Sequence, residues 1–410
     1  MESGKTKLFV SAYACEPGLG SEIGVGWHWV LELSKYFDLW VLTRKSNQNS
    51  IELWLKKQVL PGNVTFVYFD LPKKLRFWKK GLRGVRLYYI LWQKLSNKLV
   101  KKTMQEQGIR IYHLLTYGNA LWPASKYGQQ QLFIWGPTGV GDVIPFSFYR
   151  HYPLKGQLTE LLRTLIKQSL PLNRGFYKRC KNAKLILCKT EASYRSIPQR
   201  YREKALIFTD VAVSSQLSLK AQTNPVNKST YINYLAVGRL DAWRGFDVLI
   251  EAFALAVKEN PFIRLELLGK GSDKSRLQQL IRSKNMEAFI QLSGQVTMDE
   301  YYTKLLQCDV VVNPALKEGA VTVAFDSMAA GKPLICVETG GYTHYFTNDY
   351  ACVIPLTNRK RVIDEMAAAL LLLSDEKKRS TMGQLAKKQA EQFSWQKKGE
   401  DIYKLICDTL

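Results

Sequence analysis

The fold of this chain is decided by residues 313–341, which read NPALKEGAVTVAFDSMAAGKPLICVETGG. An apolar strand, 308–312, leads into this stretch, an alanine-rich helix is expected to begin at Glu318 and Gly319, and a second strand, 334–337, follows. A strand, a short polar loop and a helix in this order leave free backbone N–H groups at the helix N-terminus, where a phosphate can bind. The stretch therefore predicts an α/β unit with an anion site.

Two carboxylates in this stretch, Glu318 and Asp326, lie eight residues apart. Eight helical residues span roughly 12 Å and slightly more than two turns, so both acids would face one groove at different depths. Such a groove suits a long ligand with hydroxyls at both ends. The alternative is a helix that packs between two parallel strands, with Glu318 complementing the helix dipole.

Strand and helix patterns alternate along the whole chain, with one polar interruption at 214–230. This rhythm predicts two Rossmann-like, doubly wound parallel-sheet domains, 1–213 and 231–392, followed by a helix at 393–410. Ligands of such sheets bind at the carboxyl ends of the strands. The expected strands are 7–14, 37–44, 64–71, 110–118, 132–139, 183–190 and 205–213 in the first domain, and 232–238, 263–269, 289–294, 308–314 and 332–337 in the second.

The pattern E-x7-D followed by SMAAGKPLI resembles the E-x7-E signature of the family-4 (group 1) retaining glycosyltransferases of the GT-B fold. It departs from that signature in having Asp326 as the second acid and Ala320 where an aromatic residue is frequent. Residues 237–253, VGRLDAWRGFDVLIEAF, resemble the same family's GRLxxxKGxDxLIxAF, in which an arginine and a lysine neutralise the donor diphosphate. Here those positions are Arg239 and Arg244, and an arginine in place of the lysine keeps the charge and adds bidentate geometry. Surface arginines in a βα loop are the alternative.

The resemblance implies a GT-B enzyme whose N-terminal domain takes the acceptor and whose C-terminal domain binds a nucleotide-sugar donor, with the final helix crossing back to the N-terminal domain. Glu318 would hold the transferred sugar and stabilise the positive charge at its anomeric carbon, while Asp326 would bind the nucleotide ribose. The leaving diphosphate would be neutralised by Arg239, Arg244 and the helix N-terminus near Gly319. No DxD motif suggests a metal, and we expect neither a metal nor a cofactor. The implied reaction is front-side displacement with retention.

The first strand is followed by a glycine-rich loop, CEPGLGSEIGVGW, residues 15–27. Its spacing, G-x-G-x-x-x-G, is not the dinucleotide fingerprint, and no acid ends the second strand, so NAD binding is not expected. In the resembling enzymes this loop faces the donor, and we expect Gly20 to contact it; a tight turn without a ligand is the alternative. His113 lies where related transferases keep a histidine near the donor sugar, which implies a catalytic role. A strand histidine satisfied in the core is the alternative for His113.

The charge of the chain is unusual, because 59 Lys and Arg residues stand against 35 Asp and Glu residues, a net charge of +24. Such an excess implies an anionic partner. Residues 73–102 contain no acid and mix lysines and arginines with aromatic residues. We expect 73–86 to lie in the headgroup region of an anionic membrane. For 87–99, a packed helix whose aromatic residues belong to the core is favoured.

These patterns predict a cytoplasmic enzyme, peripheral at the inner face of the membrane, that glycosylates a lipid-linked or membrane-associated precursor of a surface polysaccharide. No apolar run reaches the length of a membrane span, and the N-terminus lacks a signal-peptide profile. Two alternatives stay open. A GT-B nucleotide-sugar epimerase would share the diphosphate site. A basic nucleic-acid-binding protein would explain the charge, but no recognised nucleic-acid motif is present and no such partner is expected.

Overall fold

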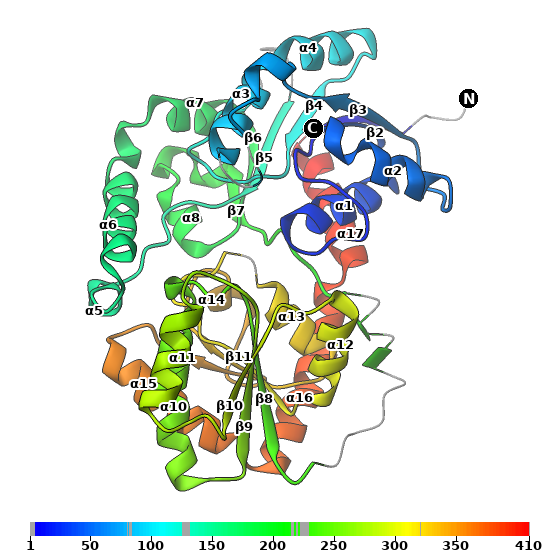
Figure 1. Ribbon diagram of the computed structural model, residues 1–410. Coiled ribbons are helices and arrows are strands. Elements are labelled where there is room, and N and C mark those ends of the chain that lie inside the picture. Colours follow the sequence, from blue (N-terminus) through cyan, green and yellow to red (C-terminus); the bar gives the residue numbers. More distant parts are fainter. Residues whose placement is uncertain are drawn as a thin grey trace. The chain divides into compact units, whose positions relative to one another are not determined.

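The computed structural model describes residues 5–79, 81, 84–124, 132–214, 217–218, 220–221, 229–319 and 321–409 (Figure 1). Ala320, Lys80, Arg83 and much of the predicted linker lie outside them. The contacts divide the chain into two compact units: unit 1 comprises residues 1–141, 169–210 and 395–410, and unit 2 comprises 142–168 and 211–394. The first domain expected at 1–213 differs from this division in two segments, because 142–168 and 211–213 both belong to unit 2.

Unit 1 is built on a parallel sheet in the order β3-β2-β1-β4-β5-β6-β7. The sheet order matches the doubly wound pattern in which the chain starts at the middle and winds outward in both directions. Its strands are β1 Lys7–Ser11, β2 Asp38–Arg44, β3 Val64–Phe69, β4 Ile111–Leu114, β5 Leu132–Thr138, β6 Ala183–Cys188 and β7 Ala205–Ile207. Its helices are α1 Ser21–Ser34, α2 Gln48–Leu55, α3 Val85–Leu95, α4 Asn97–Glu106, α7 Arg174–Asn182, α8 Glu191–Ser196 and α17 Trp395–Thr409.

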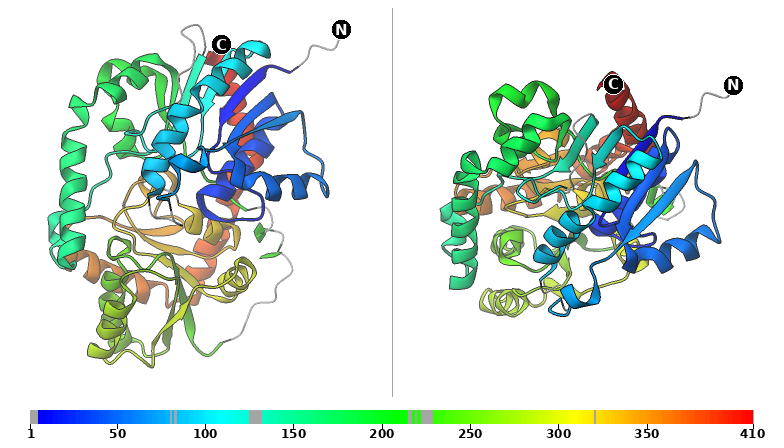
Figure 2. Two further views of the ribbon diagram at one scale, coloured as in Figure 1. Left: turned by 45° about the horizontal axis from the view of Figure 1, so that its top comes forward. Right: turned by 90° about the horizontal axis from the view of Figure 1, so that it is seen from above.

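Both faces of the unit 1 sheet are covered, since successive strand residues point to opposite sides. On β1, Phe9 packs in the cluster that includes α3, whereas Leu8 and Val10 pack in the cluster that includes α1. The C-terminal helix α17 completes the second cluster with Ile402 and Ile406. It lies beside α1 in both views (Figures 1 and 2).

Unit 2 repeats the architecture with a parallel sheet in the order β10-β9-β8-β11-β12-β13. Its strands are β8 Ile232–Val237, β9 Ile263–Leu268, β10 Ile290–Gly294, β11 Val310–Asn313, β12 Leu334–Val337 and β13 Ala351–Ile354. Its helices are α5 Phe146–Tyr149, α6 Leu154–Gln168, α10 Phe246–Glu259, α11 Lys274–Ser283, α12 Met298–Gln307, α13 Thr322–Ala329, α14 Tyr342–Tyr345, α15 Arg359–Leu372 and α16 Glu376–Ala390.

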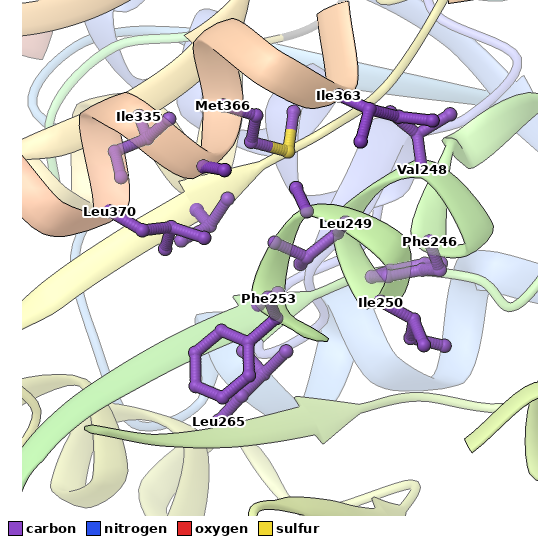
Figure 3. Packing of buried hydrophobic residues seen from close by; sticks show 14 of the residues in the cluster. Phe246, Val248, Leu249, Ile250, Phe253, Leu265, Ile335, Ile363, Met366 and Leu370 are labelled. Carbon is purple, nitrogen blue, oxygen red and sulfur yellow. The ribbon is translucent and has the colours of Figure 1, made fainter. Parts of the chain in front are cut away.

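The main core of unit 2 lies between the sheet and the pair α10 and α15. Figure 3 shows this cluster, with Leu249 and Phe253 of α10, Met366 of α15, Leu265 of β9 and Ile335 of β12; Phe253 lies next to Leu265. All five side chains are nearly or fully buried. Burial of such side chains contributes about 1.5–3 kcal/mol each, so this cluster fixes α10, and with it the loop that enters α10.

The predicted fold class, two Rossmann-like parallel sheets, is confirmed, and so is each strand expected from the sequence. The strand β13 was not expected. None of the helices in the described part of the chain combines the length and the apolar run needed to cross a bilayer.

Candidate functional site

The site residues of unit 2 gather at the carboxyl edge of its sheet, between β8 and β11. These strands are neighbours, yet the chain leaves β8 toward β9 on one side and returns as β11 on the other. Loops that leave such a switch point in opposite directions open a crevice in which ligands of α/β proteins bind. Arg239 and Arg244 follow β8, and Glu318 follows β11.

The centre of this site is an ion pair between Arg244 Nη1 and Glu318 Oε2. Both side chains are mostly withdrawn from water, which strengthens their attraction relative to a surface pair. The guanidinium of Arg244 also lies over the Trp243 ring, 4.3 Å from its centroid. Its Nε atom is buried and has no hydrogen-bond acceptor among the described residues. Arg244 is therefore held in place by contacts that leave one N–H donor for another oxygen.

Gly245 makes this pairing possible. Its φ of +68° is in the left-handed region, and a Cβ at this position would lie 2.1 Å from the carbonyl oxygen of Pro314. A hydrogen bond of 3.2 Å from Leu316 N–H to the carbonyl of Trp243 also joins the two loops. Because the two loops touch through a residue without a side chain, Arg244 on one loop reaches Glu318 on the other.

The prediction that Glu318 opens the helix is wrong, because α13 begins four residues later, at Thr322. Tertiary hydrogen bonds hold the preceding loop out of helical geometry: the Glu318 carbonyl accepts from Gly341 N–H at 3.3 Å, and Leu316 N–H is used by the β8 loop. A Cβ built on Gly319 meets nothing described within 4 Å, so space is open at that point. The helical spacing of roughly 12 Å does not describe this acid pair.

Asp326 lies inside α13 and is buried. It accepts a hydrogen bond of 2.9 Å from the hydroxyl of Tyr301 on α12. Burial raises the pKa of the Asp326 carboxyl to about 7, and the Tyr301 hydrogen bond opposes that rise. The structure thus places Asp326 in a helix–helix contact, and Glu318 in the loop ahead of the helix.

Arg239 is the exposed member of the group, with 69% of its side chain in solvent, and it pairs with Asp241 at 2.9 Å. Its loop is packed against the GKGS loop, 269–272, after β9. A Cβ on Gly269 would lie 1.8 Å from the Gly238 carbonyl, and Leu240 N–H donates to the Lys270 carbonyl at 3.0 Å. The two glycine-containing loops therefore form one wall beside Arg239.

Tyr342, on α14, is a neighbour of the ion pair that sequence reasoning missed. Its side chain is fully buried, and within the described ranges its hydroxyl has no hydrogen-bond partner. Burial raises the Tyr342 pKa well above its usual value, and the nearby Glu318 carboxylate raises it further. The sequence signal that could have pointed to Tyr342 is the pair Gly340-Gly341, which directly precedes it and ends the stretch 313–341.

In unit 1, the glycine-rich loop follows β1 at the corresponding switch point beside β4. Gly20 is exposed and is the N-cap of α1. Gly24 and Gly26 serve packing instead, because a Cβ would lie 1.8 Å from the Leu19 carbonyl or 1.9 Å from the Ala14 carbonyl. Of these three glycines, Gly20 is thus the one that stands in solvent at a helix N-terminus, where backbone N–H groups lack intrahelical partners.

The structure places His113 in the core of unit 1. It is fully buried on β4, its Nε2 donates to the Gly136 carbonyl at 2.7 Å, and its ring meets Trp29 edge to face. Burial lowers the His113 pKa to about 4, although the Gly136 hydrogen bond opposes this. This geometry is that of a strand histidine whose hydrogen bond is satisfied in the core, because the ring is not exposed to solvent.

Unit 1 contains a buried ion pair that was not predicted: Lys189, just after β6, pairs with Asp210 at 2.5 Å. Burial lowers the pKa of Lys189, but the Asp210 and Glu22 carboxylates outweigh it and the pKa is raised. Lys398 of α17 donates to the Thr209 carbonyl at 2.8 Å, and burial lowers its pKa to about 7. No sequence pattern marked these residues, which are far apart in the chain.

The basic segment 73–86 exposes Lys73, Lys74 and Phe77, the last with 78% of its surface in solvent. Further along, Tyr88 and Trp92 are buried. The prediction that the aromatic residues of 87–99 belong to the core is confirmed for the residues of α3.

Two other features bear on the site. In the described part of the chain, no three His, Cys, Asp or Glu side chains come together as a metal site requires. A cavity of about 800 Å³ in unit 2 is lined by Asn233 of β8, Arg264 and Glu266 of β9, and Phe289 just before β10. It lies at the end of the sheet opposite to Arg239.

Part of the chain matches a known protein family. Residues 220–389 match the model of the glycosyl transferases group 1 family. An uncharacterized glycosyltransferase of Methanocaldococcus jannaschii is 24% identical over 57% of this chain and 62% of that protein. A D-inositol 3-phosphate glycosyltransferase of Corynebacterium aurimucosum is 26% identical over 42% of each chain. The match thus spans less than two thirds of the length of either relative.

Solved structures match nearly the whole chain. The lipopolysaccharide outer core galactosyltransferase WaaB, in its apo form, has a TM-score of 0.65 at 13% identity, over 99% of this chain and 100% of that one. HepE of Anabaena in complex with UDP has a TM-score of 0.60 at 14% identity, over 98% and 100%. The chain thus has the GT-B fold, with two doubly wound parallel sheets, and the part of it that carries Arg244 and Glu318 is similar to the group 1 glycosyltransferases.

Proposed function

We propose that this protein is a retaining glycosyltransferase that moves a sugar from a nucleotide diphosphate sugar to a hydroxyl of a lipid-linked or membrane-associated glycan precursor. The observation that carries the proposal is the largely buried Arg244–Glu318 pair at the switch point of unit 2. It places a fixed cation and a fixed anion side by side where a diphosphate and a sugar would meet. The UDP bound in the HepE structure supports a nucleotide diphosphate as the leaving group.

In the proposed reaction, Arg239 and Arg244 take the diphosphate. Charge develops on the phosphate oxygen as its bond to the anomeric carbon breaks, and donors already in place stabilise that charge without reorganisation. Arg244 has an Nε–H donor without a described acceptor, and Arg239 extends into solvent. These two guanidinium groups supply the charge, so the proposal includes neither a metal nor a cofactor.

Glu318 acts on the sugar side. As the glycosidic bond to phosphate breaks, positive charge develops at the anomeric carbon, and the carboxylate stabilises it. The acceptor oxygen bonds to that carbon on the same face that the phosphate leaves, and the acceptor proton passes to the departing phosphate oxygen. Asp326 accepts a hydrogen bond from Tyr301 through Oδ2, and the proposal gives it no part at the anomeric carbon. The proposed role of Asp326 is to bind the ribose of the nucleotide.

Transfer assays with a panel of nucleotide-sugars test this reaction. Glu318→Gln removes the charge and keeps the shape, and a loss of about 10²-fold or more in kcat is expected in a folded protein. Glu287→Gln is the matched control, because that acid lies in unit 2 with 61% of its side chain exposed. A near-normal kcat for Glu318→Gln overturns the role of Glu318. Interconversion of the donor sugar without any acceptor would show an epimerase instead.

The acceptor side of the proposal rests on residues 73–86. Exposed Lys73, Lys74 and Phe77 suit the headgroup region of an anionic membrane, where each basic side chain adds about 1 kcal/mol. WaaB, which acts on lipopolysaccharide by its name, supports an acceptor of this class. The proposal places the enzyme at the cytoplasmic face. Vesicle binding should require anionic lipid and weaken with salt, and it should drop when Lys73, Lys74, Lys79 and Lys80 become Glu.

A further inference from the structure

Helix α6, Leu154–Gln168, has its apolar residues on the outside. Five leucines of this helix are between about half and four fifths exposed. They are Leu154 at 83%, Leu158 at 57%, Leu161 at 46%, Leu162 at 50% and Leu165 at 51%, and we call them the leucine face.

The leucine face is a single stripe. At 100° per residue, the five side chains fall within roughly 100° of the helix circumference. Glu160 lies about 150° from the centre of that stripe, and it is buried. A surface helix of a globular protein has the opposite arrangement, with its apolar stripe toward the core and its acids in water. The helix is therefore inverted with respect to unit 2.

The inner side of α6 carries charged side chains. Glu160 pairs with Arg163, and its charge is felt by Lys317 in the loop before Glu318. The preceding α5 segment is anchored by Phe148 and Tyr152, which belong to the main core of unit 2. Arg163 lies on the same helix and would move with Glu160, but rotating α6 to bury the leucines would carry the Glu160 charge away from Lys317.

The basic side chains around the leucine face favour an anionic binding partner. Glu160 is the one acid in the sequence from 143 to 168, and it is buried. Lys155, Lys167 and Arg150 are exposed. A second copy of the chain would bring these like charges together, whereas anionic lipid headgroups would pair with them. An exposed aromatic side chain, Phe146 on the adjacent α5, adds to the apolar surface.

We propose that the leucine face of α6 inserts into the surface of an anionic lipid bilayer, with Lys155 and Lys167 at the headgroups. An amphipathic helix binds in this way through buried apolar area together with attraction to anionic lipid. The inference rests on the membrane partner of the proposed function, but it depends neither on residues 73–86 nor on the transfer reaction.

Sedimentation with vesicles of phosphatidylcholine and phosphatidylglycerol tests it. The triple variant Leu158→Gln, Leu162→Gln, Leu165→Gln should lower the partition coefficient at least tenfold. The matched control is Leu53→Gln, Leu372→Gln, Leu385→Gln, since these leucines are 58%, 41% and 43% exposed on other helices, and it should bind as the unchanged protein does. Thermal unfolding should be unchanged by either triple variant, which shows that lost binding is not lost folding.

A salt series on the unchanged protein gives a second measurement. At about 0.5 M salt the Debye length falls to roughly 4 Å, so purely electrostatic binding disappears while inserted leucines retain part of the bound protein. Loss of all binding at this salt overturns the inference. So does a dimer in gel filtration that the leucine variant dissociates. If the leucine variant binds fully and the Lys73, Lys74, Lys79, Lys80 variant does not, α6 is excluded and the membrane partner of the proposed function stands.

Discussion

Replacing Asp326 by asparagine should change how the stability of the protein depends on pH. Burial raises the pKa of this carboxyl from 3.8 to about 7, so between those values the folded state holds a proton that the unfolded state releases. Stability contributed by this group is fully present below pH 3.8 and is lost as pH rises toward 7. A shift of roughly three pKa units corresponds to ~4 kcal/mol. The introduced amide would keep an acceptor for Tyr301 and carry no charge at any pH.

The assay is urea unfolding of both proteins at a series of pH values from acid to weakly alkaline. The free energy of unfolding of the variant minus that of the unchanged protein should rise with pH across this window by up to ~4 kcal/mol and then level off. Other titrating groups, including His113, cancel in the difference. Tyr301→Phe is the control, because it removes the hydrogen bond that lowers the Asp326 pKa. In a Tyr301→Phe background, the difference in unfolding free energy made by Asp326→Asn should therefore keep rising to higher pH. Parallel curves for Asp326→Asn and the unchanged protein would refute the reasoning.

Four other substitutions test the site and the position of His113. Arg239→Ala and Arg244→Ala should each weaken binding of a nucleoside diphosphate more than of the monophosphate in calorimetry, and equal effects on both ligands would exclude contact with the second phosphate. Gly245→Ala should cost more than ~1 kcal/mol of stability and also weaken diphosphate binding, since the Cβ would push the Arg244 loop off Pro314; an unchanged melting temperature contradicts this. His113→Phe should lower stability by ~1–3 kcal/mol because it leaves a buried carbonyl unpaired, with kcat retained; a folded variant without activity would restore the catalytic role of His113.

The strands were predictable from the sequence because parallel strands buried on both faces are short apolar runs. Residues 232–238 were expected as a strand, and β8 spans Ile232–Val237. The strand β13, Ala351–Ile354, was not expected; it lies at the edge of the sheet, and two of its four side chains are only partly buried. The juxtaposition of Arg244 and Glu318 was also predictable, because both follow strands that the doubly wound order makes neighbours.

Features that depend on tertiary contacts were not predictable. The start of α13 at Thr322 is set by hydrogen bonds from loops far away in the chain, not by any local capping residue. The burial of His113 depends on which face of β4 meets α1. Helix α6 buries Glu160 and exposes its leucines, whereas the leucine periodicity alone would have suggested an ordinary helix facing the core.

The last helix sets an order of events during synthesis. Domains generally fold as units while the chain emerges at ~5–20 residues per second. The core of unit 1 needs Ile402 and Ile406 of α17, so the half that is translated first has to wait until α17 has been made. All residues of unit 2 are present once Ser394 has been added. A nascent chain interrupted at that point would hold a complete unit 2 and an open unit 1, and the exposed apolar surface for chaperones to cover would lie in the older half.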